Sequence, residues 1–391
     1  MNTGKYVFSQ VASFLDANDF KKCADAYDGN YKVKQFTCWN QLLCMMFGQL
    51  SNRDSLSDLL LCLKTQRTKW YHLGIGTGIS KSNLAYANEH REWRIFADFA
   101  SILIAQARAG AIDNSELDYV SDHSVFAVDT TTIDLCLSVF WWAKFRKFKG
   151  AIRLHTMLDV KTEIPCYMHI TDGKVHEVNV LDRIVYEPGG FYIMDRAYVD
   201  WDRLYNIHEN KAYFVTRAKI NRKFARVSSS KVRKKSGVRC DQTIKLVNYY
   251  ADKEFPENFR RIKYFDEETQ KKFVFITNNF ELSPLQIAHL YKHRWKIELF
   301  FKWIKQHLKV KSFWGYSENA VKIQVYCALI TFLTVVLVKQ KMKLSQSHYE
   351  ILQILSITLL NRTPLNQLFE DALLQDFNER NVNQLKMFYF R

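Results

Sequence analysis

One predicted helix places a carboxylate among basic and aromatic side chains. The helix begins at Ser283, with Pro284 at its first position and Gln286 at the capping-box position. We expect it to continue without interruption to about Leu308. At about 100° per residue, one face then presents five chemically active side chains: Tyr291, Arg294, Glu298, Lys302 and Lys305. A carboxylate can bind a divalent metal ion and cations can bind phosphates, so this face suits chemistry on a nucleic acid.

A second face of the same helix is apolar. Four residues at helical spacing are expected to face a core: Ile297, Phe301, Ile304 and Leu308. A ladder of surface ion pairs is the alternative interpretation of the polar face, because pairs at i and i+4 are common on helices.

Two further carboxylates end predicted strands. Asp129 closes the apolar run Ser124–Asp129, and Asp195 closes Phe191–Asp195. Mg²⁺ prefers oxygen ligands, which Mn²⁺ also accepts, and two such ions can stabilise both oxygens of an in-line phosphodiester displacement. We therefore predict that Asp129, Asp195 and Glu298 are catalytic metal ligands for Mg²⁺, with Mn²⁺ as a substitute. The nearest competing carboxylates are Asp134, Asp159 and Asp172.

The elements that must position these aspartates have a β-type pattern. From about Ser121 the sequence alternates in short runs that predict strands at Ser124–Asp129, Arg153–Leu158, Cys166–Thr171, Phe191–Asp195 and Ala212–Thr216. Between the last two strands, Val199–Asn210 is predicted to be a helix. A strand-helix-strand unit in a mixed sheet indicates an α/β layered core.

The N-terminal part is predicted to be helical from about Val11 to Arg108. We expect a helical domain over residues 1–75, a candidate for binding DNA ends, and a further helical segment over 76–120. In that segment, Gly78–Leu84 offers a Gly-Ser turn and a Ser82 cap, before a helix that carries Asn83, Asn88, His90 and Arg91. A helix-turn-helix and an ordinary helical hairpin explain this pattern equally well.

Composition favours a polyanionic partner. The 391 residues include 56 Lys and Arg against 40 Asp and Glu, a formal charge of +16. Fifteen Lys and Arg against four Asp and Glu fall within Arg217–Lys263, which therefore carries +11 of that charge. This stretch includes the basic run Lys231–Lys235 and the β-prone pieces Thr243–Val247 and Arg261–Phe265. It predicts a basic, β-rich insertion over 218–270 that contacts phosphates, with a solvated loop as the alternative.

Several classes of protein are disfavoured. The N-terminus has no basic stretch followed by an apolar core, so we expect no secretory signal and an intracellular protein. The apolar run Val325–Val338 is shorter than the roughly 20 residues of a membrane span and predicts a buried helix. The eight cysteines have no zinc-ligand spacing and are expected to be reduced.

The helix motif resembles the signature of a known family. Tyr291-x2-Arg294-x3-Glu298-x6-Lys305 is similar to the signature helix of the insertion-sequence-four family of bacterial DDE transposases. The resemblance extends to Val128–Thr131 and Met194–Arg196 and covers most of the chain. It implies an RNase H-like mixed sheet flanked by helices, with a catalytic domain over 121–391 that contains the basic insertion.

The resemblance also implies an activity. Cleavage at transposon ends and strand transfer into target DNA would follow a cut-and-paste course through a hairpin, in a synaptic homodimer on inverted-repeat ends. Such an enzyme is expected in the bacterial cytoplasm, associated with the nucleoid. A metal-dependent nuclease without strand transfer and a DNA-binding protein with a decayed site are the alternatives. A membrane-surface protein is disfavoured, because the positive charge lies on a strand-prone stretch.

The remaining site residues receive roles as DNA contacts. Thr130 and Arg196 are predicted to orient ligands or hold the scissile phosphate, and Arg217 to contact the DNA backbone. The resemblance implies that four residues of the helix bind the transposon end around a displaced base: Tyr291, Arg294, Lys302 and Lys305. It also implies that Trp295 stacks on that base. A buried structural tryptophan is the alternative for Trp295.

Overall fold

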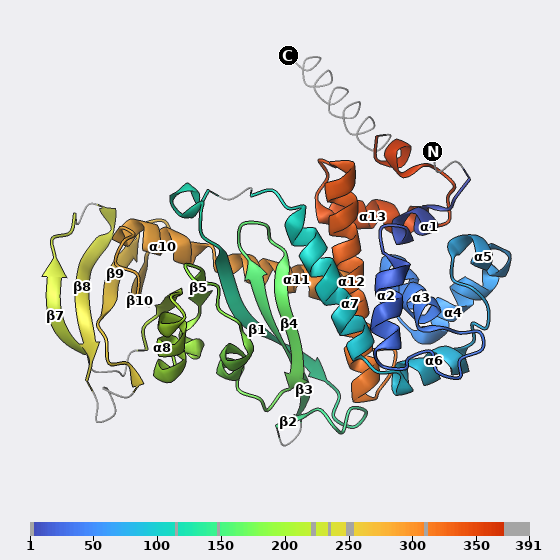
Figure 1. Cartoon of the computed structure of the whole chain (residues 1–391), viewed down its shortest axis with the longest axis horizontal. Coiled ribbons are helices and arrows are strands. Elements are labelled where there is room, and N and C mark those ends of the chain that lie inside the picture. The colour runs from blue at the N-terminus through green and yellow to red at the C-terminus, as the bar shows by residue number, and fades with distance from the viewer. Residues whose placement is uncertain are drawn as a thin grey trace, which may run out of the picture. The chain divides into compact units, whose positions relative to one another are not determined.

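The computed structural model of the chain describes residues 4–113, 116–146, 149–219, 224–233, 236–247, 254–308 and 312–370. The chain divides into two compact units. A helical unit combines Met1–Ala111 with Ile304–Arg391, and a sheet unit comprises Ile112–Trp303 (Figure 1). The domain ranges expected from the sequence assign functions to segments of the chain, and they stay predictions.

The helical unit joins both ends of the chain. Its N-terminal part contains α1 (Val7–Ala12), α2 (Ala17–Asp25), α3 (Cys38–Leu50), α4 (Leu56–Thr65), α5 (Trp70–Leu73), α6 (Lys81–His90) and α7 (Arg94–Ala109). Its C-terminal part adds α12 (Glu318–Met342) and α13 (His348–Thr358). Helix α12 contacts α3, α6 and α7, so the C-terminal helices complete a core that the N-terminal helices begin.

Helix α12 is long and apolar enough, by length and composition alone, to cross a membrane. Within the described residues it is the single helix that meets this test, and 94% of its most apolar window is buried. Side chains from Val325 to Val338 pack inside the helical unit. The predicted buried helix is confirmed.

The sheet unit is built on one mixed sheet. Its first strands are β1 (Val125–Leu135), β2 (Lys144–Arg146), β3 (Lys149–Asp159), β4 (Pro165–Asp172), β5 (Phe191–Met194) and β6 (Tyr213–Arg217). Strand β3 pairs antiparallel with β1 and β4, whereas β5 is parallel to β1 and β6 is parallel to β5. The order β4-β3-β1-β5-β6, with β3 alone reversed, is that of an RNase H-like core. The predicted fold class is confirmed.

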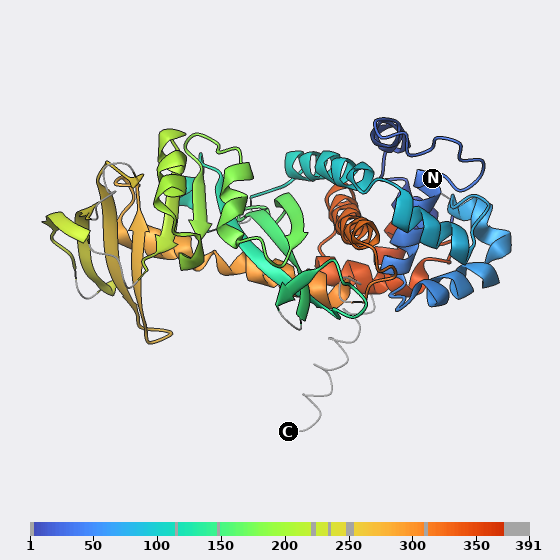
Figure 2. The ribbon, with the colours of Figure 1, turned by 90° about the horizontal axis from the view of Figure 1, so that it is seen from below.

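Helices cover both faces of this sheet. Helix α8 (Trp201–Glu209) connects β5 to β6, as predicted, and packs Trp201, Leu204 and Ile207 into an apolar cluster with Phe126 and Val128 of β1. Helix α10 (Pro284–Lys292) and the start of α11 (Trp295–His307) run along the opposite face (Figure 2). The alternation of side chains along β1 therefore gives the two faces different partners.

Four more strands extend the sheet beyond β6. They are β7 (Phe224–Ser230), β8 (Val238–Leu246), β9 (Phe259–Asp266) and β10 (Lys271–Thr277), in the order β6-β10-β9-β8-β7. The predicted strands at Thr243–Val247 and Arg261–Phe265 lie mainly within β8 and β9. Of the basic run Lys231–Lys235, residues 234 and 235 lie outside the described part of the chain.

Three local predictions were wrong in detail. Strand β1 continues past Asp129 to Leu135, because β3 pairs with it along that whole length. Helix α6 is capped by Ser80 and not by Ser82, since the Ser80 hydroxyl accepts the Asn83 N–H.

The third concerns the helix after Ser283. Its start is as predicted, with a capping box between Ser283 and Gln286. The helix is interrupted at 293–294, where Arg294 N–H donates to the Tyr291 carbonyl at 3.0 Å and Ile297 N–H to the Arg294 carbonyl at 3.3 Å. These i to i−3 bonds tighten the turn.

Candidate active site

Asp129 lies on β1, one residue beyond the last pair that β1 forms with β5, Val128 and Met194. Its carboxylate is mostly buried. The Thr130 N–H donates to Oδ1 at 2.8 Å, and an Arg294 guanidinium N–H donates to Oδ2 at 3.2 Å. The side chain is therefore fixed from its own strand and from the turn between α10 and α11.

Asp195 follows β5 directly, as predicted. The Arg196 N–H donates to its Oδ1 at 2.7 Å, and Arg217 at the end of β6 donates to the same oxygen at 2.8 and 3.1 Å. Because β5 and β6 are parallel neighbours, Asp195 and Arg217 meet at one edge of the sheet. Arg217, which we expected to contact DNA, here pairs with a predicted metal ligand.

Glu298 lies in the first turn of α11 and its side chain is 54% exposed. The Arg294 guanidinium, four residues earlier, pairs with the Glu298 carboxylate through one nitrogen and with Asp129 through the other. Arg294 thus bridges a strand carboxylate and a helix carboxylate.

The electrostatic environment differs between the two aspartates. Burial raises the pKa of Asp129 to about 6, with the Thr130 N–H and Arg294 opposing the rise and the charges of Glu298 and Asp195 adding to it. For Asp195, burial alone would raise the pKa, but the bonds from Arg196 and Arg217 outweigh it and hold the pKa below its ordinary value. Asp195 and Glu298 are therefore both close enough to interact with Asp129.

Two of the three competing aspartates accept backbone hydrogen bonds in turns, whereas Asp134 is exposed on β1. Asp159 is buried at the end of β3, where its Oδ1 accepts the N–H groups of Lys161 and Thr162. Asp172 accepts the Lys174 and Val175 N–H groups after β4. Both carboxylates stabilise turns.

The other predicted site residues vary in exposure. Trp295 is 54% exposed, which disfavours the buried structural alternative, whereas Tyr291 is only 7% exposed and packs against Phe275, with ring centroids 4.9 Å apart. Arg196 and Lys302 are exposed, and Lys305 is half-buried. The apolar stripe Ile297, Phe301, Ile304 and Leu308 is buried, as predicted.

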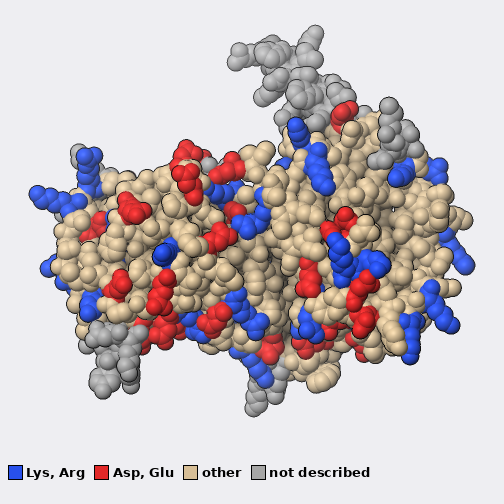
Figure 3. Space-filling model, in the orientation of Figure 1, with Lys and Arg blue, Asp and Glu red and all other residues tan. Residues whose placement is uncertain are grey.

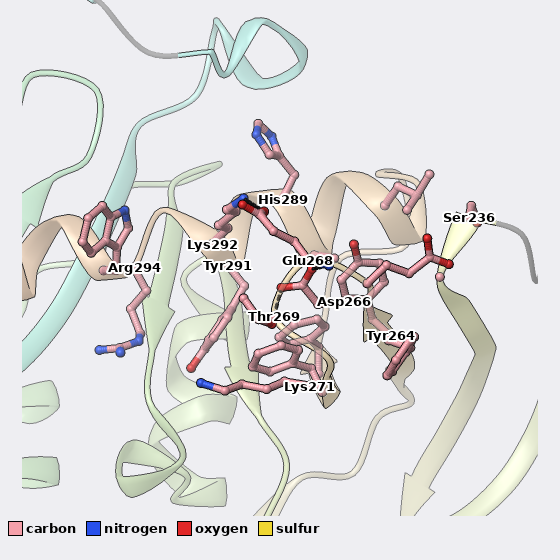
Figure 4. Close-up of a pocket in the computed structure, with 18 residues that line it drawn as sticks. Ser236, Tyr264, Asp266, Glu268, Thr269, Lys271, His289, Tyr291, Lys292 and Arg294 are labelled. Atoms are coloured by element: carbon pink, nitrogen blue, oxygen red, sulfur yellow. Dashed lines mark hydrogen bonds and ion pairs between the residues drawn. The ribbon is translucent and has the colours of Figure 1, made fainter.

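A cavity of about 760 Å³ lies between the β9–β10 hairpin and α10. Aromatic side chains line it together with cations near the carboxylates: Tyr264, Phe273, Phe275, Tyr291, Lys292, Arg294 and Trp295. Figure 4 shows Tyr291 reaching into this cavity from α10, with Arg294 at its end. Lys292 pairs with Glu268 of the hairpin at 3.1 Å. The cavity combines flat apolar surfaces with charges of both signs, because Asp266, Glu267 and Glu268 line it beside Lys271, Lys292 and Arg294.

Sequence reasoning missed two buried residues beside the site. Tyr198 and His155 both bond to the Thr130 hydroxyl, at 2.7 and 2.8 Å. Neither lies in the helix motif. The one sequence signal for Tyr198 is its place three residues after Asp195.

A divalent ion fits the donors of this site. Within the described residues, no three acidic, histidine or cysteine side chains are grouped so that they could hold a metal ion, and the three carboxylates pair with Arg294 and Arg217 instead. Carboxylates nevertheless offer the oxygen donors that Mg²⁺ and Mn²⁺ accept, and a cation would offset the burial of the Asp129 charge. A mixed sheet that presents Asp129 and Asp195 beside a helix carrying Glu298 defines the class: an RNase H-like enzyme with a carboxylate site.

Comparison with known proteins identifies the family. Residues 120–333 match the family model described as "Transposase DDE domain", and residues 3–76 match a domain of unknown function. The chain is 33% identical to a Sinorhizobium fredii protein named transposase y4zB over 64% of this chain and 68% of that one. It is 29% identical to a Geobacillus stearothermophilus transposase of insertion sequence element IS5377, over 53% and 54% of the two chains.

A third relative is a Synechocystis transposase of insertion sequence element IS4SA. The two are 24% identical over 66% of this chain and 71% of the relative. The chain belongs to the DDE transposases. The resemblance found in the helix motif is confirmed, the protein is a transposase of insertion sequence elements, and enzymes of this family act on DNA with divalent metal ions.

Proposed function

We propose that this transposase cuts DNA at the ends of its own element and joins those ends to target DNA, with Asp129, Asp195 and Glu298 as the metal ligands. One observation carries the proposal: Arg294 pairs with both Asp129 of β1 and Glu298 of α11, and the charges of Glu298 and of Asp195 on β5 both act on Asp129. A structural ion-pair ladder would not need the strand aspartates.

The carboxylates would hold Mg²⁺, with Mn²⁺ as a substitute. Bound ions would stabilise the charge that develops on the attacking and leaving oxygens of the phosphodiester. Asp129 is held by Thr130 N–H, and Asp195 by Arg196 N–H, so both ligands are oriented by their own backbone. Glu298 lies on a helix, is more exposed than the two aspartates, and would be the third metal ligand.

The arginines would exchange partners during the reaction. Arg294 and Arg217 compensate carboxylate charge in this structure. When the carboxylates are neutralised by cations, these guanidinium groups become available to DNA phosphates, which they bind bidentately. Arg196 and Lys302 are exposed near the same site and would contact the DNA backbone, with Lys305 further along α11.

The cavity beside Arg294 suits an unpaired base of the transposon end. Base–aromatic stacking contributes roughly 1–3 kcal/mol per base, and exposed Trp295 offers a ring face at the cavity. Tyr291 is covered by Phe275 and would shape the cavity wall instead of stacking. Phosphates flanking the base would contact the basic insertion. Figure 3 shows Lys and Arg side chains around the outer end of that insertion, over β7 and β8.

The proposed course has four steps. Hydrolysis nicks one strand and frees a 3′-hydroxyl, which attacks the opposite strand to form a hairpin. A second hydrolysis opens the hairpin, and the 3′-hydroxyl then attacks target DNA. We propose that two copies of the chain pair the two inverted-repeat ends, on the bacterial chromosome in the cytoplasm.

The test is a combined cleavage and joining assay. The full chain is incubated with Mg²⁺, a labelled duplex in which flanking DNA adjoins the element's terminal repeat, and a supercoiled target plasmid. We expect cleavage at the repeat boundary, a hairpin-sized product on denaturing gels, and label joined to the plasmid. Cleavage without joining would contradict transposition and favour the nuclease. Binding without cleavage would favour a DNA-binding protein that lacks catalysis.

A further inference from the structure

A chain of hydrogen bonds crosses three strands on the face of the sheet that α8 covers. The Tyr198 hydroxyl lies 2.7 Å from the Thr130 hydroxyl, which lies 2.8 Å from His155 Nδ1. His155 Nε2 lies 2.9 Å from the Thr171 hydroxyl, which donates to the Asp172 carbonyl at 3.1 Å. Tyr198 and His155 are almost completely buried.

The direction of every bond follows from the last one. Thr171 gives its single hydroxyl proton to a carbonyl, so it must accept from His155 Nε2–H. Burial lowers the pKa of His155 to about 4, so the ring is neutral at pH 7 and Nδ1 accepts. Thr130 then donates to Nδ1 and accepts from Tyr198 O–H. Each of these four side-chain groups has a partner, which fixes the rotamer of Thr130.

This series of hydrogen bonds lies where the pairing of β1 with β5 ends. The last pair is Val128 with Met194, and beyond it β5 turns into the short helix Arg196–Tyr198. From Thr130 onward, β1 has no backbone partner from β5. At this point the Tyr198 hydroxyl bonds to the Thr130 hydroxyl, so a side-chain bond replaces the backbone pairing between the two strands.

The hydrogen bond between the Tyr198 and Thr130 hydroxyls connects the two aspartates. The Thr130 N–H donates to Asp129 Oδ1, and the Tyr198 N–H donates to the Asp195 carbonyl at 3.0 Å. Tyr198 therefore joins the backbone of one aspartate to the residue that orients the other. The link is short, buried and independent of Arg294.

We propose that Tyr198, with Thr130 and His155, is a positioning residue that fixes the separation and orientation of the Asp129 and Asp195 carboxylates. The inference rests on the proposed function, in which those carboxylates bind metal. Groups that orient metal ligands commonly change metal affinity by about 10- to 100-fold when removed.

The test measures Mn²⁺ binding to the full chain by electron paramagnetic resonance, with DNA nicking as a second readout. Tyr198→Phe removes one oxygen and keeps the ring, and Thr130→Val removes the hydroxyl at the centre of the chain. We expect each to weaken Mn²⁺ binding about tenfold or more, and Thr130→Ser to restore it. The matched control is Tyr186→Phe, because Tyr186 is also buried but donates to the Leu181 carbonyl; we expect unchanged binding.

The outcomes separate this inference from the proposed function. If Asp129→Asn leaves Mn²⁺ binding unchanged, the metal site and the inference both fail. If Asp129→Asn abolishes binding but Tyr198→Phe and Thr130→Val bind as wild type does, the inference alone is overturned. Equal weakening by Tyr186→Phe, or failure of Thr130→Ser to restore binding, would attribute the effect to core packing and overturn it too.

Discussion

At the scale of single residues, Asp129 is a carboxylate with a raised pKa. Its carboxylate is mostly buried, and burial raises its pKa from 3.8 to about 6 despite the nearby Arg294. An acid whose pKa is raised on folding binds protons more tightly in the folded state. The stability contributed by protonated Asp129 is therefore present below pH 3.8 and is lost as the pH rises through about 6.

This linkage predicts a pH-dependent effect of Asp129→Asn on stability. Relative to wild type, the variant should gain about 1 kcal/mol more free energy of unfolding at pH 8 than at pH 5, because one pKa unit corresponds to about 1.4 kcal/mol. Urea denaturation in metal-free buffer at both pH values measures it. Asp134→Asn, on the same strand but exposed, is the matched control. A pH-independent effect of Asp129→Asn would contradict the raised pKa.

At the scale of elements, a buried ion pair inside the insertion holds an arginine that also bonds to the backbone just before α10. Arg260 on β9 donates two bonds of 2.8 Å to Asp241 on β8, and their side chains are only 8% and 10% exposed. Arg260 also donates to the Leu282 carbonyl, immediately before the Ser283 cap of α10. The start of the helix that leads to Arg294 therefore depends on the insertion.

Breaking this pair should be costly. Asp241→Ala leaves the Arg260 charge buried without its carboxylate, and we expect a loss of about 3 kcal/mol or more in the free energy of unfolding. Glu268→Ala removes the partner of Lys292 in a pair that is largely exposed, and should change stability much less. Equal losses in denaturant titrations of the two variants would mean that the Arg260–Asp241 pair does not hold the insertion.

Sequence patterns predicted some elements better than others. The strands that end at Asp195 and the capping box at Ser283 depend on local chemistry, and both are as expected. The interruption at 293–294 was not predicted, and at this break Arg294 contacts Asp129, which is 165 residues away along the chain, a separation that periodicity does not encode. The contacts of Tyr198 and His155 with Thr130 were not predicted for the same reason, because only the folded sheet brings these residues together.

At the scale of the whole molecule, positive charge is uneven. The stretch Arg217–Lys263 carries +11 of the total +16, and within the described residues its outer strand β7 is almost entirely exposed. A helical unit assembled from both ends of the chain completes the molecule, and the sequence alone did not indicate that α12 packs with α3 and α7. From this charge distribution we expect the insertion to contribute most of the nonspecific affinity for DNA.

Salt dependence tests this distribution. Replacing exposed Arg226 and Lys231 by glutamine should reduce the slope of log affinity against log salt by about 2, because each lost phosphate contact removes about 0.9. Lys174→Gln with Lys211→Gln removes the same charge from exposed loops of the sheet unit outside the insertion, and should leave the slope nearly unchanged. Equal slopes for the two double variants would show that only net charge matters.

The most direct measurement of the central claim compares four single variants in Mg²⁺-dependent nicking of a terminal-repeat duplex: Asp129→Asn, Asp195→Asn, Glu298→Gln and Asp159→Asn. We predict that the first three abolish nicking while DNA binding persists in a gel-shift assay. Asp159→Asn changes a carboxylate that accepts the Lys161 and Thr162 N–H groups of a turn and should retain nicking. Nicking by any of the first three at the wild-type rate, or its loss in Asp159→Asn with folding and binding intact, would contradict the assignment of Asp129, Asp195 and Glu298 as the metal ligands.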